Sequence, residues 1–178
     1  MIWLISAFCC VAFPCVALAV MSLFAKTPTH LGVRNGRLAP CPASPNCVST
    51  QAETQQHWIA PLTPEEGEES PVARIAEIIA GMPGATVVEQ KDDYLRAEFR
   101  SLIFRFCDDV EFYHDKSGGQ IHFRSASRVG HSDLGVNRKR MEEIRGHFRR
   151  GRPKVGKSAS TSGARNRHEH EMVTSGSF

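Results

Sequence analysis

The sequence predicts an α+β domain: an antiparallel β-sheet meander with one helix before it and one helix after it, both packed on one face. Three observations predict this class. Apolar residues recur at helical spacing after a serine–proline pair, segments of alternating apolar and polar residues follow, and a second helical stripe comes after them. Helices that cover one face of an antiparallel sheet are a common way to bury such apolar surfaces.

The first helix is expected to begin at Ser70-Pro71. Serine is a favoured N-cap residue and proline suits the first helical position. The apolar residues that follow lie three or four positions apart and form one stripe: Val72, Ile75, Ala76 and Ile79. Gly81 and Pro83 are expected to end this helix.

Strands are expected after this helix, because the periodicity changes to two. A short β-branched segment covers residues 86–89, and residues 94–100 alternate between apolar and charged side chains. The segment 104–113 continues the alternation, and residues 115–119 form a hairpin loop into one more strand. The side chains expected to point inward are Leu95, Ala97, Phe99, Phe104, Phe106, Val110, Phe112, Ile121 and Phe123.

The second helix is expected to run from about Asp133, a good N-cap residue, to about Arg149. Its apolar positions fall on one face, which also carries an asparagine: Asn137, Met141, Ile144 and Phe148. These two helices and the strands between them make up the expected α+β core, residues 65–149.

Residues 1–25 contain no charged side chain and are strongly apolar. A bilayer core needs about 20 such residues as a helix. A cleaved signal peptide normally has a basic start and a shorter apolar stretch, so an uncleaved transmembrane anchor is favoured, although Ala17-Leu18-Ala19 offers a cleavage site. The membrane is therefore the first expected partner.

Two signals bear on the side of the membrane on which the domain lies. Lys26, Arg34 and Arg37 follow the apolar run, which favours the cytoplasm. Cys41 and Cys47 flank a short proline-rich loop that could close as a disulfide in an oxidising compartment, or remain two reduced thiols. We expect a membrane location, with the domain on the periplasmic or extracytoplasmic side slightly favoured.

The core is expected to have extended neighbours on both sides. Residues 26–64 form a proline-rich extended segment that carries the Cys41/Cys47 loop, and the prolines exclude long helices. Residues 150–178 form a basic tail that is too polar to bury a core and is expected to be disordered. The tail lacks interleaved aromatic residues, so nucleic acid is not an expected partner.

The segment from Arg124 to Arg138 carries the predicted ligand site. Arg124 and Arg128 share a strand parity, so both guanidinium groups can project from one side of the sheet. The backbone amides of the following helix start also favour anions, although the Asp133 carboxylate competes for them. A carboxylate, a phosphate or a lipid headgroup could bind there. The candidate ligand-binding residues are Arg124, Ser125, Ser127, Arg128, His131, Asn137 and Arg138.

Three aspartates near this segment have a structural interpretation. Asp108 has the inward parity of Val110, and a buried carboxylate needs a partner. Either a β-bulge at Asp108-Asp109 turns it outward, or it meets a cation inside. In the second case Asp108, Asp109 and Asp133 would form ion pairs, with Arg124, Arg128 and Arg138 as the nearest cations, and the whole cluster could be scaffold.

An enzyme is the alternative function. Serine, histidine and aspartate groups between residues 108 and 133 are the types used by hydrolases. These groups are Ser125, Ser127, Ser132, His131, Asp108 and Asp109. The sequence lacks the Gly-x-Ser-x-Gly pattern, a nucleotide-binding glycine loop and zinc-finger spacing, and adjacent strand carboxylates point to opposite faces. No catalytic residue, metal or cofactor is therefore assigned, and a non-enzymatic binding or structural envelope module is favoured. The oligomeric state is left open.

Three motifs resemble one known family. They are LAPCPASPNCVS at residues 38–49, FCDDVEF at residues 106–112 and RSASRVGHSDLGVNR at residues 124–138. In this order they are similar to the bacterial and plastid domain-of-unknown-function family DUF1499, over roughly residues 31–148. The resemblance implies a small exported or membrane-attached protein without an assigned activity. Cys107 departs from the family, in which an apolar residue such as valine is expected. The resemblance also implies that the three motifs form one linked site, which we place in a pocket beside the last helix.

Overall fold

The computed structural model describes residues 26–102 and 105–150 of the 178-residue chain. The expected anchor at residues 1–25, the strand position Phe104 and the basic tail after Arg150 lie outside the described residues. Within the described part, neither helix has the length and apolarity that a bilayer crossing requires.

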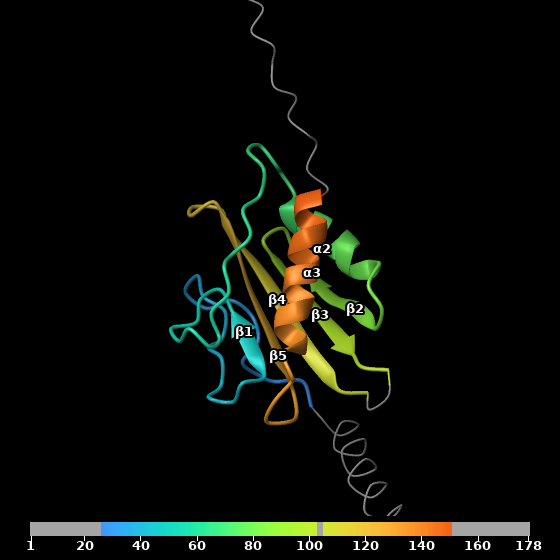
Figure 1. Ribbon diagram of the computed structural model, residues 1–178. Helices are drawn as coiled ribbons and strands as arrows, with labels where there is room; N and C mark the ends of the chain where they lie inside the picture. The colour runs from blue at the N-terminus through green and yellow to red at the C-terminus, as the bar shows by residue number, and fades with distance from the viewer. Residues whose placement is uncertain (1–25, 103–104, 151–178) are drawn as a thin grey trace, which may run out of the picture.

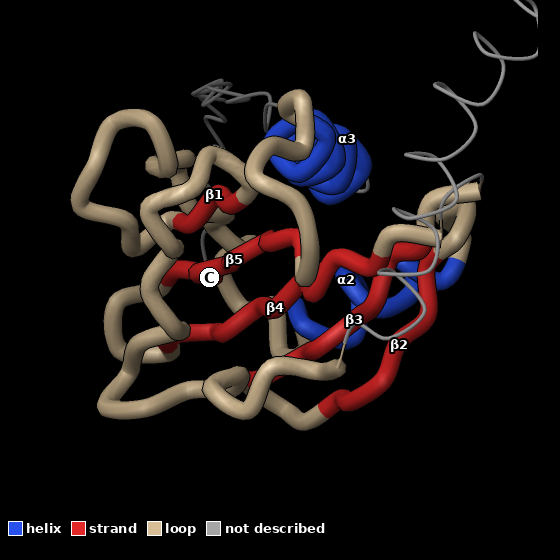
Figure 2. The backbone as a smooth tube through the Cα atoms, turned by 90° about the horizontal axis from the view of Figure 1, so that it is seen from below, coloured by secondary structure: helices blue, strands red, loops and turns tan. Residues whose placement is uncertain are grey.

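The described chain forms an α+β fold with one antiparallel five-stranded sheet and two helices (Figure 1). The strand order is β1-β5-β4-β3-β2, so strands β2 to β5 form the predicted meander and β1 is added at its edge. Both helices lie on the same face of the sheet (Figures 1 and 2). The elements are β1 (Cys47–Ser49), α2 (Pro71–Ala80), β2 (Ala85–Gln90), β3 (Tyr94–Arg100), β4 (Cys107–Asp115), β5 (Gln120–Ser127) and α3 (Val136–Arg150).

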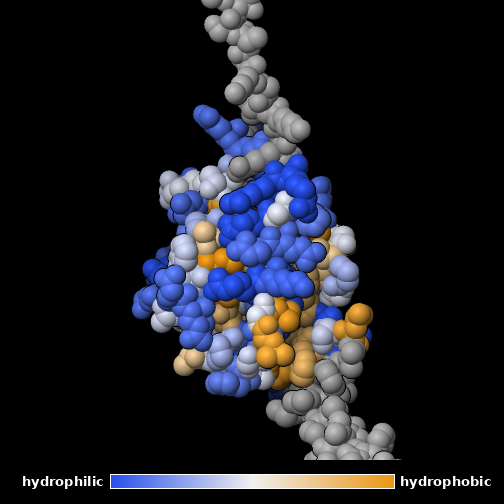
Figure 3. Space-filling view, viewed as in Figure 1, coloured by the Kyte–Doolittle hydropathy of each residue, from blue (hydrophilic) through white to orange (hydrophobic). Residues whose placement is uncertain are grey.

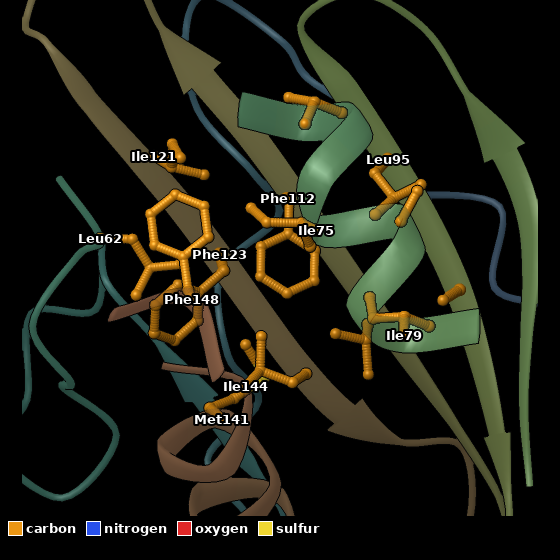
Figure 4. Close-up of a cluster of buried hydrophobic side chains, with 14 of the residues drawn as sticks. Leu62, Ile75, Ile79, Leu95, Phe112, Ile121, Phe123, Met141, Ile144 and Phe148 are labelled. Carbon is orange, nitrogen blue, oxygen red and sulfur yellow. The ribbon is translucent and has the colours of Figure 1, made fainter. Parts of the chain in front are cut away.

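The core lies between the sheet and the two helices (Figure 4). Phe112 of β4 and Phe123 of β5 are fully buried, with ring centroids 5.9 Å apart. The stripes predicted from the sequence face them: Val72, Ile75, Ala76 and Ile79 from α2, and Met141, Ile144 and Phe148 from α3. The predicted inward parity is confirmed for the positions that belong to the apolar core: Leu95, Ala97, Phe99, Val110, Phe112, Ile121 and Phe123. Phe106, also predicted to point inward, precedes β4 and is only half-buried, so its assignment to an inward strand position was wrong.

The extended segment before the core contributes to the fold more than its sequence indicates. β1 pairs with β5, with Cys47 opposite Ala126 and Ser49 opposite Arg124. Leu62 also forms an antiparallel bridge with Ile121 and belongs to the apolar core. A strand of three residues is too short to show a period of two, so the expectation of a wholly irregular segment was wrong here.

The helix starts differ in detail from the expected ones. Ser70 occupies the N-cap position of α2, but its side chain makes no capping hydrogen bond. α3 begins at Val136, three residues after Asp133. The Asp133 carboxylate still caps this helix, because it accepts hydrogen bonds from the backbone N–H groups of Gly135 (3.0 Å) and Asn137 (2.8 Å).

Candidate functional site

The sheet separates the predicted site residues into two groups. β4 and β5 pair without a register shift from Asp108, opposite Ser127, to Asp115. Of the two alternatives left open for Asp108, the β-bulge is therefore absent from this ladder, and the inward carboxylate with a cation partner is the one observed. The two carboxylates point to opposite faces. Asp108 faces the helices, whereas Asp109 lies on the sheet face away from them, which we call the far face.

On the helix side, Asp108 belongs to a buried polar network beneath α3. Its carboxylate accepts a hydrogen bond from Arg140 at 2.6 Å. Arg140 also donates to Asn137 Oδ1 (2.8 Å) and to Ser125 Oγ (3.2 Å). Asn137 and Ser125 are fully buried. This network satisfies the inward carboxylate and fixes α3 against β4 and β5.

The same network holds the disulfide loop. Cys41 and Cys47 are joined by a disulfide with their Cα atoms 5.7 Å apart. Asn137 Nδ2 donates to the Asn46 carbonyl and to Ser127 Oγ, both at 3.1 Å. The Asn46 side chain donates in turn to the Gly130 carbonyl at 2.7 Å. The loop, the strand β5 and the helix α3 are thus connected through two asparagines.

Arg140 is not among the cations that were predicted to pair with Asp108. Arg140 lies one helical turn after Asn137, so both side chains belong to the same helix face, a spacing that could have identified it. Arg138 instead donates to the backbone carbonyls of Gln56 (2.9 Å) and Trp58 (3.0 Å). The expected ion pairs of Asp108 and Asp133 with Arg124, Arg128 or Arg138 were wrong, because Arg140 binds Asp108 and the Asp133 carboxylate binds backbone amides.

On the far face, Arg128 is the centre of an ion-pair cluster with two acidic residues. Its guanidinium donates to both carboxylate oxygens of Asp109, at 2.7 and 2.8 Å, and to Glu98 at 2.5 Å. Burial raises the pKa of Glu98, but the hydrogen bonds and charges of Arg128 and then Arg100 outweigh burial and lower it. Burial raises the pKa of the neighbouring Cys107 thiol to about 11. These contacts identify Arg128 as a scaffold residue.

Arg124, also on the far face, is far less well satisfied. It is 4% exposed, and its ionic partner Glu111 lies 3.5 Å away, beyond good hydrogen-bond distance. Among the described residues, Arg124 Nε has no hydrogen-bond partner, and neither has Glu111 Oε2. The other oxygen of Glu111 accepts from Tyr94 (2.9 Å) and from Gly32 N–H (2.7 Å). Burial lowers the pKa of Arg124, and the carboxylate of Glu111 partly offsets that shift.

Arg124 lines a cavity of about 930 Å³ between the far face and the segment before β1. Figure 2 shows loops on this side of the sheet, opposite α3. The wall is formed by the N-terminal segment and the disulfide loop, and the floor by β5. Its apolar side chains are Pro28, Leu38, Ala39, Pro40, Pro42, Ala52 and Ala126, and its basic ones are His30, Arg34, Arg37, His57, Arg124 and Arg128. Two acidic residues, Glu53 and Asp109, also line it.

His57 is the second cavity residue with an unsatisfied group. It is 7% exposed, and its Nδ1 lies 3.1 Å from Thr54 Oγ1. Its Nε2 is buried without a hydrogen-bond partner among the described residues. His57 and Arg124 both line the cavity, which has room for a polar ligand between its walls.

The comparisons with known proteins identify the family. The family described as "Protein of unknown function (DUF1499)" matches residues 37–148, which include the disulfide loop, β4, β5 and most of α3. The chain belongs to the DUF1499 family. This confirms the resemblance recognised in the sequence. No curated protein matches the chain, and no solved structure matches it either.

The DUF1499 motifs were predicted to meet in one pocket beside the last helix, but they divide between the two faces of the sheet. Asp108, Ser125 and Asn137 lie beside α3, whereas Asp109, Arg124 and Arg128 lie on the far face. Ser127, at the end of β5, touches both groups, since it binds Asn137 and lines the cavity. The disulfide loop also reaches both, through Asn46 on the helix side and Cys41 in the cavity wall.

His131 does not join a hydrolase-type arrangement in the described part of this DUF1499 domain. Its side chain is exposed, and none of the hydrogen bonds found there connects it to Ser125, Ser127 or Ser132. Ser132 Oγ instead accepts from the backbone N–H of Leu134 at 3.2 Å. Within residues 26–102 and 105–150, no group of three or more His, Cys, Asp or Glu side chains is placed to hold a metal ion.

His122 gives this DUF1499 domain a predicted pH dependence. Burial lowers its pKa from the ordinary value of 6.5, while the charge of Asp115 partly offsets the shift. The unfolded chain therefore takes up this proton at a higher pH than the folded chain, and stability is lost as the pH falls below about 6.5. Melting temperatures measured from about pH 7.5 down to pH 5 should fall less steeply for His122→Gln than for the unmodified chain. The exposed His147→Gln is the control, and equal slopes for His122→Gln and the unmodified chain would contradict the prediction.

Proposed function

We propose that this DUF1499 protein is a membrane-attached, non-enzymatic binding module that holds an anionic ligand in the far-face cavity. Arg124 would contact the anionic group directly. One observation carries the proposal: a guanidinium that is 4% exposed lines a large cavity and has a buried Nε without a partner in the described structure.

A buried cation with too few hydrogen-bond acceptors is costly. A guanidinium has five N–H donors, and burial without acceptors costs several kcal/mol. Glu111 balances the charge of Arg124 but lies at 3.5 Å and is already shared with Tyr94 and Gly32. A carboxylate or phosphate in the cavity would supply the missing acceptors, and guanidinium binds both groups with matched geometry.

The other charges of the cavity also favour an anion. Asp109 is neutralised by Arg128, so its carboxylate does not repel a bound anion strongly. Arg34 and Arg37 are exposed on a two-residue turn, at Asn35-Gly36, and line the same cavity. They would draw anions toward the cavity from solution.

One feature supports the membrane attachment, and a second supports the side of the membrane on which the domain lies. Residues 1–25 form an uncharged apolar run long enough for a bilayer helix. The Cys41–Cys47 disulfide is typical of oxidising compartments, which favours the periplasmic or extracytoplasmic side. The ligand could be a free anion or the headgroup of an anionic lipid, since both present the same chemistry.

The test uses the full chain in detergent, with inorganic phosphate as the probe. Arg124→Gln should weaken phosphate binding by about 10- to 100-fold, because it removes charge-assisted hydrogen bonds. Ala126→Leu narrows the cavity while Arg124 is retained, and it should weaken binding as well. Arg149→Gln removes the same charge from an exposed position at the end of α3 and should leave binding unchanged.

Two arms of this experiment distinguish the sources of the anion. Isothermal titration measures phosphate in solution, and flotation with phosphatidylcholine vesicles, with or without phosphatidylglycerol, measures headgroup binding. A headgroup ligand predicts an Arg124-dependent preference for the phosphatidylglycerol vesicles, whereas a free anion predicts phosphate binding without that preference. Phosphate affinity and lipid preference that are the same in Arg124→Gln and Arg149→Gln would reject the proposed site.

A further inference from the structure

We propose that one end of the domain lies in the membrane interface and inserts two leucines, Leu102 and Leu134, among the lipids. This end consists of Ser101 and Leu102, which follow β3, and of the β5–α3 connection, residues 128–135, and we call it the membrane end. The inference rests on the proposed membrane attachment and extends it, because an anchor alone does not fix which surface of the domain meets the bilayer.

The two leucines are exposed to an unusual degree. Leu134 is 93% exposed and Leu102 is 88% exposed, and the nearby Val136 is 48% exposed. The other large hydrophobic residues exposed in the described part, Trp58 and Val88, are each 43% exposed. A single exposed leucine is ordinary on a protein surface, whereas exposed apolar side chains that gather at one end of a domain mark an interaction site.

The backbone at Leu134 holds its side chain outward. Leu134 has a φ of 54°, in the left-handed region that side chains other than Gly, Asn and Asp rarely adopt. Its N–H is bound by Ser132 Oγ at 3.2 Å, and the next N–H, of Gly135, is bound by Asp133 at 3.0 Å. An asparagine or glycine would fit this conformation with less strain. The sequence nevertheless places a leucine there, on a loop fixed from both sides by hydrogen bonds.

Both leucines lie at the same end of the sheet. β3 ends at Arg100, opposite Cys107 at the start of β4, and β5 ends at Ser127, opposite Asp108. The Arg128 N–H donates to the Cys107 carbonyl at 3.0 Å, so the two connections leave the sheet side by side. Figure 3 shows hydrophobic surface gathered at the lower end of the face that carries α3.

The described chain begins at this same end (Figure 1). Pro28 lines the cavity together with Ser127 and Arg128, which places the first described residues beside the end of β5. The 25 residues that precede Lys26 are uncharged and apolar. A chain attached to a bilayer through them would bring the membrane end within a few residues of the lipid surface. Exposed leucines at such a position gain apolar contact by entering the interface, as the apolar side chains of interfacial segments do.

Photocrosslinking of the full chain tests the inference. Benzoylphenylalanine replaces Leu134 or Leu102 in two separate variants, and the chain is reconstituted into vesicles of phosphatidylcholine and phosphatidylglycerol. The matched control places it at Ser117, in the exposed β4–β5 turn at the opposite end of the sheet. After irradiation, mass spectrometry identifies lipid adducts and flotation measures attachment.

We expect all three variants to float with the vesicles. Lipid adducts should form at positions 134 and 102, and none should form at position 117. If the variants float but positions 134 and 102 give no more lipid adduct than position 117, the membrane end is wrong while the attachment stands. Adducts to residues 1–25 or to a second copy of the chain would show another occupant and overturn the inference. A chain that does not float would reject the attachment and this inference together.

Discussion

Replacing Asp108 with alanine is expected to lower the free energy of unfolding by about 3–5 kcal/mol, the cost of breaking a buried ion pair from one side. Arg140 would lose the carboxylate that it contacts at 2.6 Å, while its guanidinium remains largely buried between α3 and the sheet. Urea denaturation of the full chain in detergent, followed by circular dichroism, measures the change. The exposed Asp92→Ala is the control and should alter stability by less than about 0.5 kcal/mol.

The double variant Asp108→Leu with Arg140→Met separates the ion pair from the remaining contacts. If the pair acts as one unit, the double variant should lose less free energy of unfolding than the sum of the losses for Asp108→Leu alone and Arg140→Met alone. A loss below about 1 kcal/mol for Asp108→Ala, or strict additivity in the double variant, would mean that the network does not hold α3 in place.

Changing Glu111 to glutamine is expected to destabilise the protein and at the same time make it more responsive to phosphate. The amide oxygen can still accept from Tyr94 and Gly32, but the charge opposite Arg124 is lost. An uncompensated buried guanidinium costs about 3–5 kcal/mol, and a bound anion would restore part of this loss. The rise in melting temperature with added phosphate should therefore be larger for Glu111→Gln than for the unmodified chain.

Glu53→Gln provides the matched comparison for Glu111→Gln. Glu53 is an exposed acid of the same cavity, so its replacement removes the same charge without leaving a buried cation. If phosphate stabilises Glu111→Gln no more than Glu53→Gln, Arg124 does not contact the anion.

The periodicity of the sequence was sufficient to predict the helices, the meander and the parity of the strands. It placed Asp108 on the buried side and Arg124 and Arg128 on one common side. These predictions succeeded because side-chain direction in a helix or strand follows from the backbone repeat alone.

The contacts made by irregular segments could not be predicted in this way. Asn137 binds the carbonyl of Asn46 across 91 positions of sequence, and Gly32 binds Glu111 across 79. Neither contact leaves a periodic signal, because loops carry no repeat. The cavity depends on the segment around Leu38 folding over the far face, so its position and the isolation of Arg124 within it emerged only from the structure.

The most direct measurement is a crystal structure of the full chain grown in detergent with selenate, whose anomalous scattering locates the anion. The account predicts a selenium peak in the far-face cavity, with selenate oxygens in hydrogen-bond contact with the Arg124 guanidinium. A structure in which the cavity contains no selenate and the Arg124 guanidinium is hydrogen-bonded to protein groups alone would contradict this prediction.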